Sequence, residues 1–132
     1  MRVMGLNVFA IVVAAIVIYA IEFVIFGLLI PGEQYAAMVG LNMDQMHADR
    51  MPIGVIPPIL AAIGLAFAIK WRNQPGWMAG AVTGLMMALF FAFAGGLYGY
   101  VYGAHNEQFV FVNLAHFLLC YAAAGAVLGA WK

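Results

Sequence analysis

Apolar residues form four long runs along this chain, separated by shorter polar segments. The runs are continuous rather than alternating, and each far exceeds the about 9–11 residues of a membrane β-strand, so helices are predicted. A helix rises about 1.5 Å per residue, so about 20 residues cross a hydrocarbon core of about 30 Å. The expected spans are residues 8–30, 52–70, 77–102 and 109–131.

The links between the runs predict how the helices are arranged. Residues 72–76, which contain a Pro-Gly pair, and residues 103–108 are short links, so the last three spans are expected to be antiparallel neighbours. The first link, residues 31–50, is long. No repeat or linker divides the chain. The sequence therefore predicts an all-α, polytopic membrane protein, with residues 1–132 as one antiparallel bundle of four transmembrane helices.

Composition excludes several other classes of protein. Of the 132 residues, 67% are hydrophobic and 8% are charged, whereas a soluble domain is about 45–50% apolar and about 25% charged. Five basic residues balance five acidic ones, so no basic surface for nucleic acid is expected. The single cysteine, Cys120, allows no internal disulfide and is interpreted as a small packing residue. The first apolar run is too long for a signal peptide and is interpreted as a retained span.

The positions of the cations predict an orientation. Arg2, Lys70, Arg72 and Lys132 fall on one side of a four-span arrangement, and Arg50 falls on the other side among acidic residues. Lys and Arg favour the cytoplasmic side of a membrane, so both termini are expected in the cytoplasm. All three tryptophans gather near that same side, as an interfacial belt requires. We therefore expect a multi-pass protein of the bacterial inner membrane, surrounded by membrane lipid.

Glycine pairs predict close helix packing, because helices in lipid associate where small side chains let their backbones approach. Three pairs have the G-x-x-x-G spacing: Gly80 and Gly84, Gly99 and Gly103, and Gly125 and Gly129. The last span carries small residues on one face and polar residues on the opposite face. A second contact surface suggests a homo-oligomer or a membrane-protein partner. The alternative is that glycine is simply common in membrane spans.

Glu22 and His116 stand out as ionisable residues inside predicted spans, where such groups are costly and usually face a partner or a polar cavity. Each lies about 10–12 Å from the outer end of its span, so both are expected at the same depth in the membrane. Tyr19 and Asn113, each three residues from one of the pair, extend the set. We predict a ligand or proton site at these four residues.

Two backbone features are expected in the same layer. Pro57 and Pro58 are predicted to break the second helix there and to free backbone carbonyls, because proline lacks an amide donor. Gly95 and Gly96 reach a similar depth on the third span and would leave a gap.

The pair has a structural and a functional interpretation. In the first, a hydrogen bond between Glu22 and His116 only fixes helix register. In the second, they line a polar pocket open to the outside, and the protein is a small channel, carrier or small-ligand-binding protein. A further alternative is a non-catalytic accessory or stabilising subunit of a larger membrane complex. No nucleophile with a base is visible, so no enzyme is expected.

Metal and cofactor sites receive weaker support. The long link and the residue that follows it hold four methionines and a histidine, at Met38, Met43, Met46, His47 and Met51. Such donors suit Cu(I), but methionines at helical spacing more often form the apolar side of a short interfacial helix. His105 and Glu107 lack a fixed ligand spacing, and haem held by two imidazoles would need a second intramembrane histidine. No metal or cofactor is expected.

Two stretches carry a resemblance to a known family. The first is Gly32-Glu33-Gln34-Tyr35-x-x-Met38-Val39-Gly40-Leu41-Asn42, and the second runs from Asn113-x-x-His116 through Gly125 and Gly129 to Trp131. They resemble a family of small bacterial four-span membrane proteins of unknown function, with a departure at Phe26-Gly27, where an aromatic pair is expected. The likeness covers most of the chain in hydropathy and order. It implies a four-span fold and no reaction, because the family's activity is uncharacterised.

Overall fold

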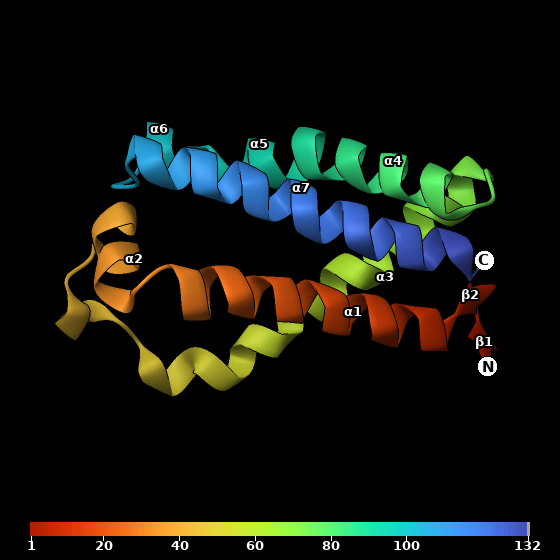
Figure 1. Cartoon of the computed structure of the whole chain (residues 1–132), viewed down its shortest axis with the longest axis horizontal. Coiled ribbons are helices and arrows are strands. Elements are labelled where there is room, and N and C mark those ends of the chain that lie inside the picture. The colour runs from red at the N-terminus through yellow and green to blue at the C-terminus, as the bar shows by residue number, and fades with distance from the viewer. Residues whose placement is uncertain (132) are drawn as a thin grey trace.

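The computed structural model describes residues 1–131, and Lys132, one of the cations in the orientation argument, lies outside them. Within the described residues, four helical segments are long and apolar enough to cross a membrane: Val8–Leu29, Ala48–Arg72, Trp77–Val101 and Glu107–Ala130. Successive segments run in opposite directions along the long axis of the molecule (Figure 1). The all-α fold class predicted from the hydrophobic runs is confirmed.

A short hairpin precedes the first segment. Strands β1 (Arg2–Val3) and β2 (Leu6–Asn7) pair antiparallel, and α1 (Val8–Glu22) follows directly. Asn7 accepts the amides of Phe9 and Ala10 at the start of α1, which satisfies donors that lack a partner within the helix. Beyond α1 the segment continues as a π-helix, η1 (Phe23–Leu29).

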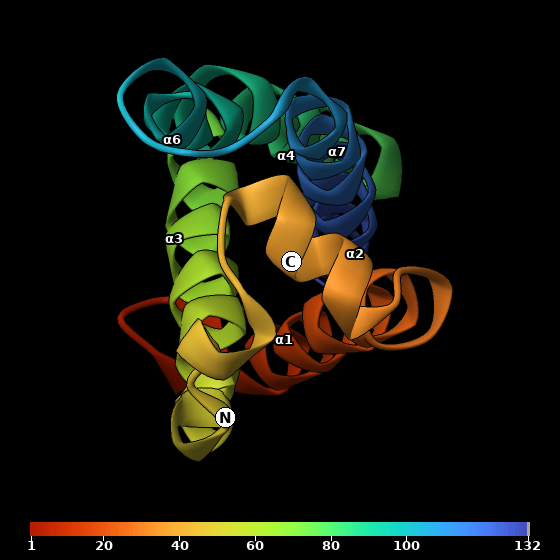
Figure 2. The ribbon, with the colours of Figure 1, turned by 90° about the vertical axis from the view of Figure 1, so that its left-hand side faces the viewer.

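The first link, between the first two apolar runs, is largely helical. It contains α2 (Gly32–Val39) and two 3₁₀ helices, η2 (Met43–Gln45) and η3 (Ala48–Val55). Helix α2 lies across the end of the bundle that faces the viewer in Figure 2. η3 runs directly into α3 (Ile56–Arg72), so the second apolar segment begins earlier than the hydrophobic run suggested.

Pro57 and Pro58 lie at the point of the second apolar segment where its geometry changes from a 3₁₀ helix to an α-helix. α3 begins at Ile56, so both prolines occupy its first turn. The fixed φ of proline suits the first turn of an α-helix. Because proline has no N–H, the carbonyls four residues before Pro57 and Pro58 receive no α-helical hydrogen bond from them. The change of geometry comes just before them, where η3 meets α3.

The third apolar segment is built from four consecutive pieces and the fourth from one. The third comprises α4 (Trp77–Met87), a π-helix η4 (Ala88–Phe93), α5 (Ala94–Gly96) and α6 (Tyr98–Val101). The fourth is the single helix α7 (Glu107–Ala130), whose N-cap Asn106 accepts the amide of Phe109.

Helices α4 and α7 pack at backbone contact through two of the predicted glycine pairs. A Cβ added to Gly80 would lie 2.9 Å from the Cα of Gly129, and one added to Gly84 would lie 3.1 Å from the nitrogen of Ala122. Gly125 in turn lies against Gly80. These small faces are therefore covered inside one chain, which removes the main reason to expect a second contact between protomers.

Gly99 and Gly103 do not form a helix-packing face. α6 ends at Val101, so Gly103 lies in the turn beyond it, where a Cβ would stand 2.7 Å from the carbonyl oxygen of Gly99. The ring of His105 fills the space above Gly99. The G-x-x-x-G spacing is typical of packed helices, but here the two glycines allow a tight turn.

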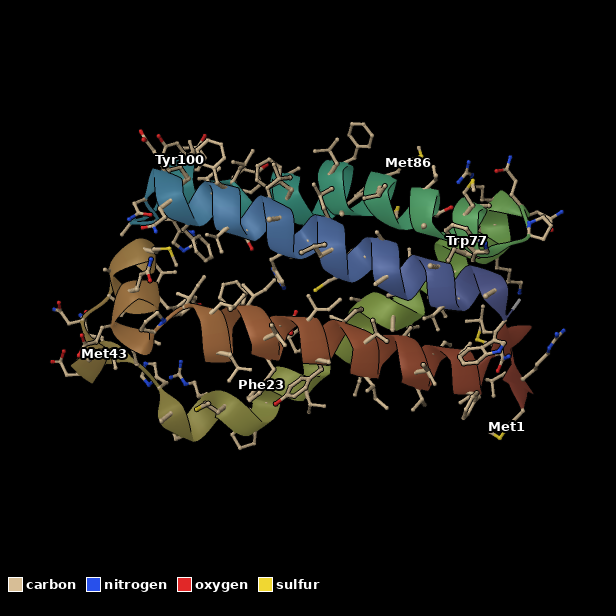
Figure 3. The ribbon with its side chains drawn as sticks, in the orientation of Figure 1. Met1, Phe23, Met43, Trp77, Met86 and Tyr100 are labelled. Atoms are coloured by element: carbon tan, nitrogen blue, oxygen red, sulfur yellow. The ribbon has the colours of Figure 1, made fainter. Side chains whose placement is uncertain are left out.

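The buried core lies between α1, α3 and α7. It is formed by small and branched side chains: Leu6, Ala10, Ala14, Ala15, Ile18, Ala62, Leu65, Ala66, Ile69, Cys120, Ala124 and Leu128. Large apolar side chains instead cover the outer faces, and Met86 points away from α7 (Figure 3). Phe91 and Phe111 are 69% and 72% exposed, as suits helices whose outer faces contact lipid.

Two hydrogen bonds fasten the N-terminal hairpin to α3 and to the end of α7. The Lys70 Nζ donates to the Met4 carbonyl at 2.6 Å, and the Asn7 Nδ2 donates to the Trp131 carbonyl at 3.1 Å. Figure 1 shows the N- and C-terminal ends at the same end of the bundle. The cytoplasmic location of that end stays a prediction from the charges of Arg2, Lys70 and Arg72.

Candidate functional site: a polar cluster between α1 and α7

The structure brings Glu22 and His116 together inside the bundle, although 94 positions separate them in sequence. Glu22 ends α1, and His116 lies in the middle of α7. The His116 Nε2 stands 3.1 Å from the Glu22 Oε1, and the His116 Nδ1 stands 3.3 Å from the Asn113 Oδ1. The imidazole is 9% exposed and the carboxyl 27% exposed, so the pair has one partly open side.

The balance of donors and acceptors in this chain of contacts depends on the tautomer of His116. The Asn113 Oδ1 can only accept, so the tautomer of His116 that carries its hydrogen on Nδ1 satisfies this contact. A neutral imidazole then presents a bare lone pair at Nε2, and this lone pair faces a carboxylate oxygen, which also only accepts. In this tautomer, a proton or a metal ion between the two atoms satisfies both of them.

Cys120 adds a third group to the same place. Its Sγ, a carboxylate oxygen of Glu22 and a ring nitrogen of His116 all lie within 4.8 Å of one another. Cys120 is fully buried, and its thiol contacts the Ile18 carbonyl at 3.8 Å. The sequence analysis took Cys120 for a packing residue. Cys120 lies four residues, about one helical turn, after His116 in the sequence. This spacing places both side chains on one face of α7.

Aromatic rings pack against the imidazole of His116. The rings of Phe26 and Phe117 lie 5.0 Å and 4.8 Å from that of His116. Tyr35 of α2 packs on Phe26 at 5.6 Å, and burial raises the pKa of the Tyr35 phenol above its ordinary value. The Asn106 amide donates to the Met38 carbonyl at 2.8 Å, which fastens α2 to the start of α7.

Tyr19 does not join the cluster, which corrects the prediction that it extends the set. It is 48% exposed and lines a groove between α1 and α3 together with Pro58 and Ile59. Ile18 and Glu22, one turn apart, face α7, and a residue next to Ile18 is rotated by about 100° around the helix. Tyr19 therefore points toward α3, and Pro58 lines the same groove.

Gly96 meets the expectation of a gap beside the cluster, and Gly95 does not. A Cβ on Gly96 would stand 2.8 Å from the Asn113 Nδ2 and 3.4 Å from the ring of Phe117. A Cβ on Gly95 would meet nothing within 4 Å. Gly96 thus leaves room for Asn113, the residue that orients the imidazole.

The backbone next to Glu22 has a rare geometry that sequence reasoning missed. The π-helix η1 starts at Phe23, directly after Glu22, and carries Phe26 to the ring of His116. Single π-helical turns are uncommon and occur often at functional sites, because they change the direction in which side chains point. Here the π-helix places an aromatic ring over the imidazole.

The other candidate groups stay apart. His47 lies 3.9 Å from Asp49 on the surface, and the Glu107 carboxyl contacts the Tyr100 hydroxyl at 3.4 Å. The ring of His105 packs against Phe109 at 4.6 Å. Met38 is buried in α2, whereas Met43 and Met51 are exposed. Within residues 1–131, the group of ligating side chains that converges is Glu22, His116 and Cys120.

The fold and the cluster define a protein with four apolar helices able to span a membrane and a buried polar group between the first and the last. The chain belongs to the family described as Protein of unknown function (DUF1761), which matches residues 9–129. The resemblance of residues 32–42 and 113–131 to a family of unknown function is thereby confirmed. No curated protein and no solved structure matches the chain.

Proposed function

We propose that this protein is a small membrane carrier or channel that binds a cation at Glu22 and His116. The observation that carries the proposal is the 3.1 Å contact between the His116 Nε2 and the Glu22 Oε1, two atoms that both accept when the imidazole donates to Asn113. Such a contact attracts a cation into a segment otherwise built of apolar side chains.

The burial of the pair favours binding over a purely structural role. Fixing the register of α1 against α7 needs only neutral partners, and the contact between His116 and Asn113 lies within α7 itself. An ionisable carboxyl within a membrane segment is costly and is retained mostly where ions or protons move. Glu22 is 27% exposed and His116 is 9% exposed, so the proposal has the cation approach the pair from the Glu22 side.

Flux into liposomes tests the proposal. Purified protein is reconstituted into liposomes that contain a pH-sensitive dye, or a zinc-sensitive dye with external Zn²⁺, and a potassium diffusion potential drives cation entry. We expect wild-type protein to admit at least one of the two cations and Glu22→Gln to reduce entry to the level of protein-free liposomes. Glu33→Gln, an exposed acid on α2, is the matched control and should behave like wild type.

The structural interpretation makes the opposite prediction for the same variants. If Glu22→Gln and wild type give equal flux while the variant unfolds more easily, the pair only fixes helix register and the carrier proposal fails. Circular dichroism of each variant in detergent shows whether the helices are intact, so a loss of flux through misfolding is recognised.

The alternative function, an accessory subunit of a larger complex, has lost its main structural support. It rested on glycine faces that could dock a partner, but Gly80, Gly84, Gly125 and Gly129 pack against one another's helices within the chain. A second protein that accompanies the chain at fixed stoichiometry through purification from native membranes, together with absent flux, would favour the subunit instead.

A further inference from the structure

Three different metal-binding groups meet between α1 and α7, and only two of them enter the function proposed above. The carboxylate of Glu22, the imidazole of His116 and the thiol of Cys120 come within 4.8 Å of one another. We propose that they form a binding site for a divalent transition-metal ion of the zinc class. This inference rests on the proposed function, because it names the cation that the same cluster binds.

The donor set fits this class of ion. Zinc sites in proteins use cysteine sulfur, histidine nitrogen and carboxylate oxygen, and two ligand atoms around one zinc ion lie about 3.5 Å apart. The Glu22 Oε1 and His116 Nε2 already stand 3.1 Å apart. The Cys120 Sγ lies within 4.8 Å of both, so it has about 1 Å to close, which rotation about its Cα–Cβ bond can supply.

The charges of the cluster select a divalent ion. A carboxylate and a thiolate carry two negative charges, and the imidazole is neutral, so a divalent ion makes the site neutral overall. Neutrality matters because an uncompensated charge is costly between apolar helices. A monovalent copper ion would leave one negative charge, whereas Mg²⁺ and Ca²⁺ prefer sites built from oxygen alone.

Binding exchanges protons for the metal ion. The thiol of Cys120 gives up its proton when sulfur becomes a ligand, and the proton shared by Glu22 and His116 also leaves. Each divalent ion therefore replaces two protons, which are released to the buffer. The two bonds to hydrogen that break are replaced by bonds from sulfur and nitrogen to the metal.

A supporting contact orients the imidazole for this role. The Asn113 Oδ1 accepts from the His116 Nδ1 at 3.3 Å, so the lone pair of Nε2 points at the place where the ion would lie. Metal-binding histidines almost always donate their second ring nitrogen in this manner. Three protein ligands leave a fourth position free, as in zinc sites that exchange a ligand.

Cobalt(II) provides the test, because it replaces zinc and its absorption reports the ligands. Full-length protein in detergent is titrated with CoCl₂ and then with ZnCl₂. We expect a thiolate-to-cobalt charge-transfer band in the near ultraviolet that saturates at one equivalent and disappears on addition of Zn²⁺. Cys120→Ser should lose the band and weaken Co²⁺ binding by about tenfold or more. His47→Gln, a surface histidine, is the control and should match wild type.

Each outcome bears on one of the two proposals. A wild-type protein without the charge-transfer band, or a Cys120→Ser variant that retains it, overturns the metal site. If Cys120→Ser does not fold, Cys120→Ala keeps the buried space apolar and answers the same question. Flux that depends on Glu22 without Co²⁺ binding leaves the carrier proposal intact and removes the metal ion. Co²⁺ binding without flux supports the metal site and overturns the carrier proposal.

Discussion

The contact between α4 and α7 gives the sharpest test of the packing. We change Gly80 to alanine. The added Cβ would lie 2.9 Å from the Gly129 Cα and closer still to the Gly125 carbonyl oxygen, whereas carbon atoms in contact stand about 3.5–4.0 Å apart. The obstacle is backbone, so rotation of a side chain cannot relieve it and the two helices must separate.

The expected cost follows from that separation. A gap of about 0.5–1 Å removes a quarter to a half of each dispersion contact along the interface, and overpacking of cores costs about 1–3 kcal/mol. We take the upper value, about 3 kcal/mol, because the clash involves two backbone positions. Alanine regains about 1 kcal/mol of helix propensity, so Gly80→Ala should lose about 2 kcal/mol, or about 30-fold in the unfolding equilibrium.

Gly64→Ala is the matched control, since Gly64 lies in the interior of α3 and a Cβ there meets nothing within 4 Å. It should be neutral or gain up to about 1 kcal/mol from propensity alone. The free energy of unfolding is measured by titrating the folded protein in mild detergent with sodium dodecyl sulfate and following helicity. Equal stability of the two variants would show that α4 and α7 are not in backbone contact.

Two further substitutions test contacts near the two ends of the bundle, at Asn7 and at Tyr35. Asn7→Ala removes the side-chain oxygen that accepts two amides of α1 and should cost about 1 kcal/mol in the same titration, whereas Asn7→Ser keeps a capping oxygen and should cost less. Burial raises the pKa of Tyr35, so the folded protein holds this proton more tightly than the unfolded chain does. The resulting stability is complete below about pH 10 and is lost as the pH rises through the folded-state pKa. Tyr35→Phe should therefore lose less thermal stability than wild type between neutral and strongly alkaline pH, and identical losses would contradict the burial of the phenol.

Hydrophobic runs were sufficient to predict the four apolar helices. In lipid every backbone amide needs a partner within its own segment, so a run of about 20 apolar residues has essentially one conformation available. The same reasoning could not predict α2, because residues 32–39 are amphipathic and their helix depends on Ala36 and Met38 being buried against the rest of the bundle. Nor could it predict the π-helices, since these arise from packing between helices rather than from composition.

The candidate cluster was predictable in part. Depth along the spans brought Glu22 and His116 to the same level, because rise per residue converts position directly into height. Rotation about the helix axis was harder to predict: Tyr19 has the spacing to join Glu22 but points toward α3, and Cys120 was taken for packing although it faces the pair. Polar residues face one another only if their helices are rotated toward each other. That rotation depends on where the neighbouring helices lie, which a single sequence does not show.

The two faces of α7 explain why a polar cluster can exist in so apolar a chain. One face carries Gly125 and Gly129 and meets α4 at backbone distance, which fixes the two helices against each other. The other presents His116 and Cys120 to α1 across side-chain contacts, which leave room for polar atoms. Because the glycine contact cannot widen without losing its dispersion energy, entry of a cation is expected to move α1 and its π-helical end rather than α4.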